Sequence, residues 1–153
     1  MIVYEFNKSN QHHVSIKLWF KKWESYVIDK DFSSARKLFD KNVVSFGTWM
    51  DVVQGLDSLE EKQWKKIWPK ITNFTFLTET LFVQLSLDNL FSNCVLAWDS
   101  VGYDEFGKKF KRSGRATITL NRDNFNKPWK AIHSHLSLNR NVPQISYGKK
   151  ISE

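Results

Sequence analysis

The chain has 153 residues, 41% of them apolar, a net charge of +7 and a single cysteine, Cys94. This length suits one globular domain, residues 1–153, with its core at about 13–139 and a tail at 140–153. No apolar run reaches the roughly 20 residues of a membrane span, and the start lacks a signal-peptide pattern. We therefore expect a cytoplasmic protein with no membrane partner. One cysteine excludes an internal disulfide.

The positive charge is spread over several segments and does not form one arm. Lysines occur in "KLWFKKW", "KQWKKIWPK" and "FGKKFKR", which is typical of a solvated surface and argues against a nucleic-acid partner. The glycines never fall in the spacing of a dinucleotide or phosphate-binding loop.

Two helices are predicted near the start of the chain. Apolar residues from Ile16 to Val27 recur with the i, i+3, i+4, i+7 spacing of an amphipathic helix. Asp31 is the expected N-cap of a short second helix, in which Phe32 and Phe39 share a face. A brief strand is expected at residues 42–47.

A third helix is predicted before Pro69. Ser58 and Glu61 have the spacing of a capping box, and Trp64, Ile67 and Trp68 follow on one face. Pro69 is expected to end this helix, because the residue before a proline is pushed out of helical geometry.

After Pro69 the pattern becomes that of β-strands. Strands are expected at residues 74–87, 91–103, 109–120 and 129–138, separated by turns rich in Asp, Asn, Gly and Pro. Helices followed by strands predict an α+β fold, with helices on one face of a strongly curved antiparallel sheet.

Several motifs together resemble a known family. "FDKNVVSFGT", "VQGLDSLEEKQWKKIWPKI", "AWDSVG", "RSGRATITLNRD" and "WKAIHSHLSL" look like the SnoaL-like branch of the nuclear transport factor 2 (ketosteroid isomerase-like) superfamily. The likeness runs from about Trp19 to Pro143. It implies a cone in which N-terminal helices and a curved antiparallel sheet enclose a pocket, and a homodimer paired through the convex sheet face. Members include isomerases, cyclases, dehydratases and structural modules.

Two relatives show which residues would have to match. Ketosteroid isomerase uses a carboxylate base that faces a tyrosine and a protonated acid; the nearest candidates here are Asp99 and Tyr103. "VQGLD" and "WKAIHSHLS" also resemble the association domain of calcium/calmodulin-dependent kinase II. In that domain an arginine follows the second histidine and lines the pocket, whereas Leu136 occupies the matching position here.

His133 and His135 are the most conspicuous chemical pair. Strand alternation predicts that both share one face with Trp129, Ala131 and Ser137. A strand places residues i and i+2 roughly 7 Å apart, so two imidazoles could meet one metal, but no third ligand has a diagnostic spacing. We therefore expect no metal site.

The histidines have two further interpretations. Hydrogen bonding within the sheet or at a subunit interface is favoured over catalysis, and His133, His135 and Asp99 remain the catalytic candidates. His12 and His13 lie in a chain start that is expected to be mobile.

Arg115 is the main candidate for binding an anion. It shares the polar face of its strand with Thr117, and an arginine in a pocket could hold a carboxylate. The alternative is a cross-strand pair in which Arg112 or Arg115 meets Asp99, depending on the register. Tryptophans are foremost core residues, although some could line a cavity. The candidate ligand-binding residues are Trp64, Trp68, Trp98, Arg115, Thr117 and His133.

The sequence favours a small organic molecule as the ligand, bound in the cone without a cofactor. Any catalysis would be general acid/base chemistry of the isomerase, cyclase or dehydratase type, for which a pocket His or Asp with a shifted pKa is required. The alternative is a non-catalytic binding or dimerisation module, with a small pocket and paired polar groups. No nucleophile with an adjacent base is identifiable.

Overall fold

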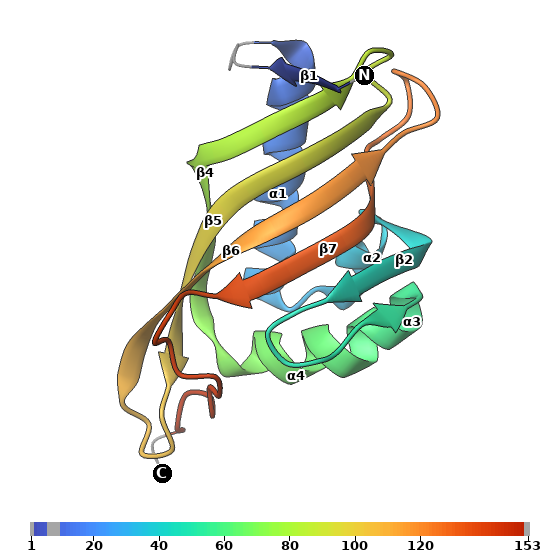
Figure 1. The fold of residues 1–153 in the computed structure, drawn as a ribbon. Coiled ribbons are helices and arrows are strands. Elements are labelled where there is room, and N and C mark those ends of the chain that lie inside the picture. Colours follow the sequence, from blue (N-terminus) through green and yellow to red (C-terminus); the bar gives the residue numbers. More distant parts are fainter. Residues whose placement is uncertain (1, 6–9, 152–153) are drawn as a thin grey trace.

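The computed structural model describes residues 2–5 and 10–151, and its strands form one curved sheet (Figure 1). In these residues the sheet has seven strands, in the order β1-β4-β5-β6-β7-β2-β3. The strands are β1 Ile2–Glu5, β2 Phe39–Phe46, β3 Val53–Gln54, β4 Thr72–Ser86, β5 Phe91–Tyr103, β6 Lys109–Asn121 and β7 Lys130–Leu138.

The helices lie on one side of this sheet, and no described helix covers the other side (Figure 1). We call these sides the inner and the outer face. The helical segments are α1 Gln11–Asp29, α2 Phe32–Arg36, α3 Leu56–Leu59, the π-helix η1 Glu60–Trp64, α4 Lys65–Ile67 and the 3-10 turn η2 Trp68–Lys70. The predicted α+β fold, with N-terminal helices on a curved sheet, is confirmed.

Helix α1 is longer than its apolar stripe predicts. It begins after Asn10, whose side chain accepts a hydrogen bond from the His12 backbone N–H at 2.8 Å, and it ends at Lys30 in the left-handed conformation. His12 and His13 are buried in its first turn, so the expectation that they lie in a mobile start is wrong. The predicted start of this helix is too late, because the apolar periodicity begins only at Ile16, after the N-cap Asn10.

The two following helices differ in part from their prediction. The Asp31 side chain accepts from the Ser34 backbone N–H at 3.0 Å, so the predicted cap of α2 is confirmed. Phe39 opens β2 and is not on the helix. Helix α3 starts after Gly55, which has φ of 94° and provides no side-chain cap, so the predicted capping box of Ser58 and Glu61 is wrong.

The four long strands form where the alternation predicts them, within two residues at each end, and pair antiparallel. Strand β2 adds a feature that the sequence pattern does not reveal. It runs parallel to β7, with Ser45 opposite Ser134, and the two hydroxyl oxygens lie 2.7 Å apart in the buried interior. This pairing brings the loop after β2 under the sheet, beside the helices.

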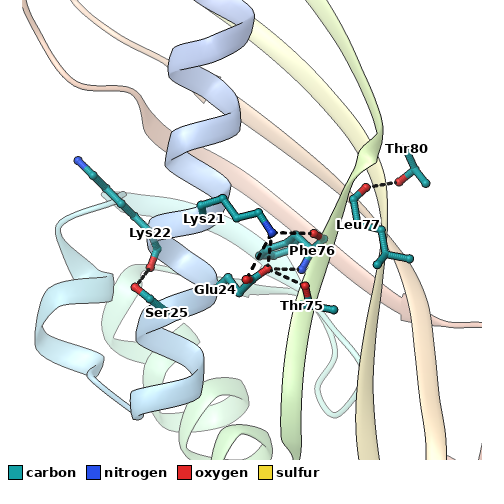
Figure 2. Close-up of polar contacts among 8 residues, drawn as sticks. All are labelled: Lys21, Lys22, Glu24, Ser25, Thr75, Phe76, Leu77 and Thr80. Carbon is teal, nitrogen blue, oxygen red and sulfur yellow. Dashed lines mark hydrogen bonds and ion pairs between the residues drawn. The ribbon is translucent and has the colours of Figure 1, made fainter. Parts of the chain in front are cut away.

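Glu24 fastens α1 to the sheet (Figure 2). Among the described residues, β1 pairs with β4 only at residues 83–86, and no other described strand pairs with this edge of β4. The Glu24 carboxylate accepts from the Phe76 backbone N–H at 2.6 Å and from the Thr75 hydroxyl at 3.0 Å. Lys21 pairs with Glu24 at 3.3 Å on the solvent side. A side chain thus satisfies a strand edge that would otherwise be open.

Residues 140–151 have no regular structure, but they are fixed to the sheet. The Ser146 hydroxyl is buried; it donates to the Lys70 carbonyl at 2.5 Å and accepts from the Tyr103 backbone N–H at 3.0 Å. Tyr147 N–H donates to the Tyr103 carbonyl at 2.8 Å. The segment therefore runs beside the long β5–β6 hairpin (Figure 1). Among the described helices, none has the length and apolar character needed to span a membrane.

Candidate functional site

A small cavity lies between the inner face of the sheet and the helices. Its volume is about 30 Å³, which is room for one or two water molecules. Aromatic and aliphatic side chains form most of the wall, and its polar side chains are Thr48, Gln63, Arg112 and Ser134. The lining residues are Trp23, Val27, Phe46, Gly47, Thr48, Leu59, Gln63, Trp64, Ile67, Trp68, Ile71, Phe74, Trp98, Arg112, Ser134 and Leu136.

Arg112 is the main polar feature of the wall. Its side chain projects from β6 to the inner face and is only 1% exposed. The Nη2 group donates to the Thr48 hydroxyl at 2.9 Å, and the guanidinium lies 5.4 Å from the centroid of the Trp98 ring. Its Nε has no hydrogen-bond partner in the described structure. Burial lowers the pKa of Arg112 to about 10, so the group stays protonated at neutral pH.

The segment after β2 closes the cavity over Arg112. Thr48 bonds Arg112 and also accepts from Gln63 Nε2 at 3.2 Å, while Gln63 Oε1 accepts from the Trp49 backbone N–H at 3.1 Å. Gly47 makes room for the Gln63 amide, because a Cβ at this position would lie 2.8 Å from it. Gln63 belongs to the π-helix η1, and π-bulges occur frequently at functional sites.

Unpartnered donors are concentrated at this cavity. Besides Arg112 Nε, the buried indole nitrogens of Trp23 and Trp98 have no hydrogen-bond partner within the described residues. Each is an N–H donor. The acceptors on the wall are already used: the Ser134 and Ser45 hydroxyls bond each other, and Gln63 Oε1 is occupied. Among the described side chains of the cavity wall, unpaired hydrogen-bond donors therefore outnumber free hydrogen-bond acceptors.

The candidate ligand-binding residues divide between the two faces of the sheet. Trp64, Trp68 and Trp98 line the cavity, and the rings of Trp64 and Trp68 stack at 4.8 Å. Arg115 and Thr117 lie on the outer face, in the row of β6 that pairs with Ala97 and Val95. His133 lies on that outer face too, opposite Thr119.

A β-bulge in β7 explains why the two histidines lie on the outer face of the sheet. Leu120 pairs with Ala131 whereas the adjacent Thr119 pairs with His133, so β7 has one extra residue at Ile132. Ala131 therefore faces the core, whereas His133, His135 and Ser137 face outward. The prediction that the two histidines share a face with Ser137 is confirmed, but the prediction that Trp129 and Ala131 lie on that face is wrong. This single insertion reverses the face of every later residue.

On the outer face each histidine has a structural contact. His133 Nδ1 donates to the Val44 carbonyl at 2.8 Å. His135 lies against Phe46, with ring centroids 4.0 Å apart. Desolvation lowers the pKa of His135, and the positive charges of His133 and Arg115 contribute to the same shift.

Asp99 lies on the outer face as well. It is opposite Ser113, and its carboxylate lies 3.6 Å from Lys111 Nζ. Neither arginine pairs with it, because Arg112 is opposite Ser100 and Arg115 is opposite Ala97. The predicted pairing of Asp99 with one of the two arginines is therefore wrong.

Elsewhere among the described residues, the metal-ligating side chains and the thiol of Cys94 form no site. In the described part of the chain, no group of three His, Cys, Asp or Glu residues is placed to hold a metal ion. Cys94 is fully buried in β5, and burial raises the pKa of its thiol to about 12. A thiol with so little thiolate is a poor nucleophile.

Solved structures share this arrangement of helices and sheet. No protein-family profile matches the chain, and no curated protein matches its sequence. A nuclear transport factor 2-like superfamily protein from Salmonella enterica superposes with a TM-score of 0.65 at 12% identity, over 85% of this chain and 92% of that one. The chain has a nuclear transport factor 2-like fold.

Two further structures with this nuclear transport factor 2-like shape extend the comparison. A ketosteroid isomerase-like protein from Erwinia carotovora gives a TM-score of 0.70 at 12% identity, over 88% of this chain and 99% of that one. A putative calcium/calmodulin-dependent protein kinase II association domain from Xanthomonas campestris gives 0.70 at 18% identity, over 90% and 94%. At identities this low, the superpositions establish the fold alone. The predicted resemblance is therefore confirmed for the fold.

Arg112 is the residue of the candidate site that the sequence analysis did not place in the cavity. Its signal was available: strand alternation puts it on the same face as Ala116, Ile118 and Leu120, which is the apolar face of β6. A charged residue on an apolar face is informative, because arginine is rarely buried without a partner.

Proposed function

We propose that this chain is a non-catalytic binding protein that holds a small organic molecule in its cone. The observation that carries the proposal is the chemistry of the wall. Among the described residues that line the cavity, Arg112 is the only ionisable side chain. General acid/base catalysis needs a group that gains and loses a proton near the working pH, and a guanidinium with a pKa of about 10 remains protonated there. Binding without proton transfer fits this wall better than an isomerase, cyclase or dehydratase.

The cavity volume limits the size of the ligand. Space for one or two waters accepts a larger molecule only if the wall moves. The segment over Arg112 is the natural place for movement, because it is irregular between β2 and β3 and is held by side-chain hydrogen bonds of Thr48 and Gln63. We expect a compact ligand whose apolar part packs against Trp64 and Trp68.

The test combines native mass spectrometry of the purified chain with NMR of the tryptophan indole N–H groups. A fragment set containing neutral, acidic and basic molecules should shift the signals of Trp64 or Trp98. Leu136→Phe, which fills the cavity, should abolish the shifts, while Leu138→Phe, outside the cavity lining, should preserve them. Fragments that bind equally well to the filled variant, or no fragment that reaches these signals and no co-purified molecule, would refute binding in the cone.

A second candidate function is assembly into a homodimer through the outer face. This face carries exposed apolar side chains: the cross-strand pair Phe82 and Val95, 66% and 39% exposed, and, on β2 beyond β6 and β7, Val44 at 40%. Contiguous exposed apolar surface is typical of protein interfaces. Sedimentation equilibrium tests it. Val95→Lys should give a monomer, whereas Val52→Lys, at an exposed position outside this face, should not; a monomeric parent chain would contradict the proposal.

A further inference from the structure

We propose that the molecule held in the cone is a small carboxylate, bound side-on by the Nε–H and Nη2–H groups of Arg112. This inference rests on the proposed binding function and adds the chemical class of the ligand. It depends on three features of the cavity: the free edge of the guanidinium, the missing counter-charge and the surplus of donors.

The geometry of the guanidinium provides the receptor. Nε–H and one N–H of Nη2 point from the same edge of this planar group, with the spacing of the two oxygens of a carboxylate. On that edge Nε has no partner, and Nη2 has a neutral one, the Thr48 hydroxyl at 2.9 Å. Thr48 can release Arg112 without losing every contact, because it also accepts from Gln63 Nε2 at 3.2 Å. The edge is therefore available to a bidentate acceptor.

The charge of Arg112 is not balanced by the chain. Within the described residues, no carboxylate forms an ion pair with this side chain, although it is 1% exposed. Besides the neutral Thr48 hydroxyl, the charge is supported by the Trp98 ring, whose centroid lies 5.4 Å from the guanidinium carbon. A buried cation without a counter-charge is costly to keep. A bound anion supplies that counter-charge, whereas a cationic ligand would be repelled.

The remaining wall defines the rest of the ligand. Trp23 and Trp98 also have unpartnered indole N–H groups, so a second acceptor atom on the ligand could be satisfied. Trp64, Trp68 and Phe74 supply aromatic surface for an apolar body. A monocarboxylate with a short apolar or planar body matches these groups. A multiply charged anion does not, because Arg112 is the one positive charge among the described residues that line the cavity.

The test compares carboxylates with neutral molecules of the same shape on the full chain. Benzoate and butyrate are titrated beside benzamide and butyramide, while NMR follows the Arg112 Nε–H and the tryptophan indole signals. We expect the carboxylates to shift the Arg112 Nε–H signal and to bind at least about tenfold more tightly than the amides, since charge-assisted bidentate bonds are the stronger kind. Arg112→Met should remove this preference.

Two further variants separate the charge of Arg112 from the shape and the position of its guanidinium. Arg112→Lys keeps a positive charge but loses the side-on edge, so it should weaken carboxylate binding by about tenfold. Arg115→Met removes an arginine of the same strand from the outer face and should leave binding unchanged. Thermal melts of all variants verify that each is folded.

The outcomes separate this inference from the proposed function. Amides that bind as tightly as their carboxylates, with Arg112→Met unaffected, would overturn the carboxylate and leave binding in the cone standing. Carboxylate binding that is lost in Arg115→Met and kept in Arg112→Met would place the anion on the outer face and overturn the inference. Carboxylates that shift no Arg112 or indole signal at millimolar concentration would overturn it as well.

Discussion

The buried charge of Arg112 lowers the stability of the folded chain. Within the part of the chain that the structure describes, its guanidinium is buried with one neutral acceptor, the Thr48 hydroxyl, and burial lowers the pKa of Arg112 to about 10. We predict that Arg112→Met raises the free energy of unfolding, by about 1–3 kcal/mol, because a flexible apolar side chain fills similar space without desolvating a charge. Urea unfolding of the ligand-free protein measures the change.

The matched variant is Arg115→Met, on the exposed side of the same strand. It should change the free energy of unfolding by no more than about 0.5 kcal/mol. A strongly destabilised Arg112→Met with an unaffected Arg115→Met would mean that the buried guanidinium supports the fold and is not held at a cost.

His135 should make stability depend on pH. Desolvation, His133 and Arg115 lower its pKa below the ordinary value of 6.5. The unfolded chain therefore binds this proton more readily than the folded chain. Its contribution is fully present above about pH 6.5 and is lost as the pH falls through the lowered folded-state pKa.

Urea unfolding between pH 5 and pH 8 tests this, with His135→Gln as the variant. The difference in stability between the parent chain and His135→Gln should shrink or reverse as the pH falls below about 6.5. A difference that stays constant over this range would show that His135 titrates alike in both states.

At the scale of elements, Glu24 joins a helix to a strand edge (Figure 2). Its carboxylate accepts the Phe76 backbone N–H at 2.6 Å, and the side chain is largely buried, at 16% exposure. Glu24→Ala should lower the free energy of unfolding by about 1–3 kcal/mol, because that N–H would lose its acceptor. Glu61→Ala, an exposed control, should cost at most about 1 kcal/mol. Equal losses of stability in the two variants would show that the Glu24 contact with β4 does not stabilise the fold.

Strands β5, β6 and β7 can approach closely because residue 114 has no side chain. A Cβ on Gly114 would overlap the Ser137 carbonyl oxygen and the Trp98 ring. We predict that Gly114→Ala costs about 1–3 kcal/mol through overpacking. It should also alter the near-ultraviolet circular dichroism of the tryptophans, and Gly55→Ala, at an open position with positive φ, should lower stability without that spectral change.

Elements that depend on local pattern could be predicted from the sequence. The four long strands alternate regularly and are joined by turn residues, so their bounds agree with the structure within two residues. The failures involve longer-range geometry. Nothing local marks the bulge at Ile132, which turns His133 and His135 outward, or the parallel pairing of β2 with β7. Helix α3 lacks its predicted cap because Gly55, with φ of 94°, starts it earlier.

The candidate site could be predicted only in its apolar part. Helical and strand periodicity puts Trp64, Trp68 and Trp98 toward the core, and in the structure these residues line the cavity. The polar part depends on β2 lying parallel to β7, which carries Thr48 across the chain to Arg112, 64 residues away. Periodicity within one segment holds no information about such a pairing.

At the scale of the whole molecule, the sheet is completed by contacts between distant parts of the chain. Ser45 and Ser134 are 89 residues apart in sequence and bond each other where β2 joins β7. Closing so long a loop loses much chain entropy before the contact compensates, so such pairings slow folding. The cavity wall around Arg112 therefore forms only when the last strand, β7, pairs with β2.

Because Cys94 is deeply buried, the reactivity of its thiol reports how often the strands around it separate. The thiol is central in the sheet, between Val83 and Ile118 on the adjacent strands, and 0% exposed. A thiol reagent such as Ellman's reagent can reach it only when these strands separate, so the labelling rate measures how often the sheet opens.

We predict that labelling is slow in the native protein, and that Gly114→Ala accelerates it by the factor that its loss of stability implies, about tenfold for each 1.4 kcal/mol. Arg112→Met should retard it. Fast labelling that ignores both variants would mean that the centre of the sheet opens by a local movement, without unfolding of the cone. The rate of this one labelling reaction can therefore show, without any engineered cysteine, whether a ligand in the cavity keeps the strands of the sheet together.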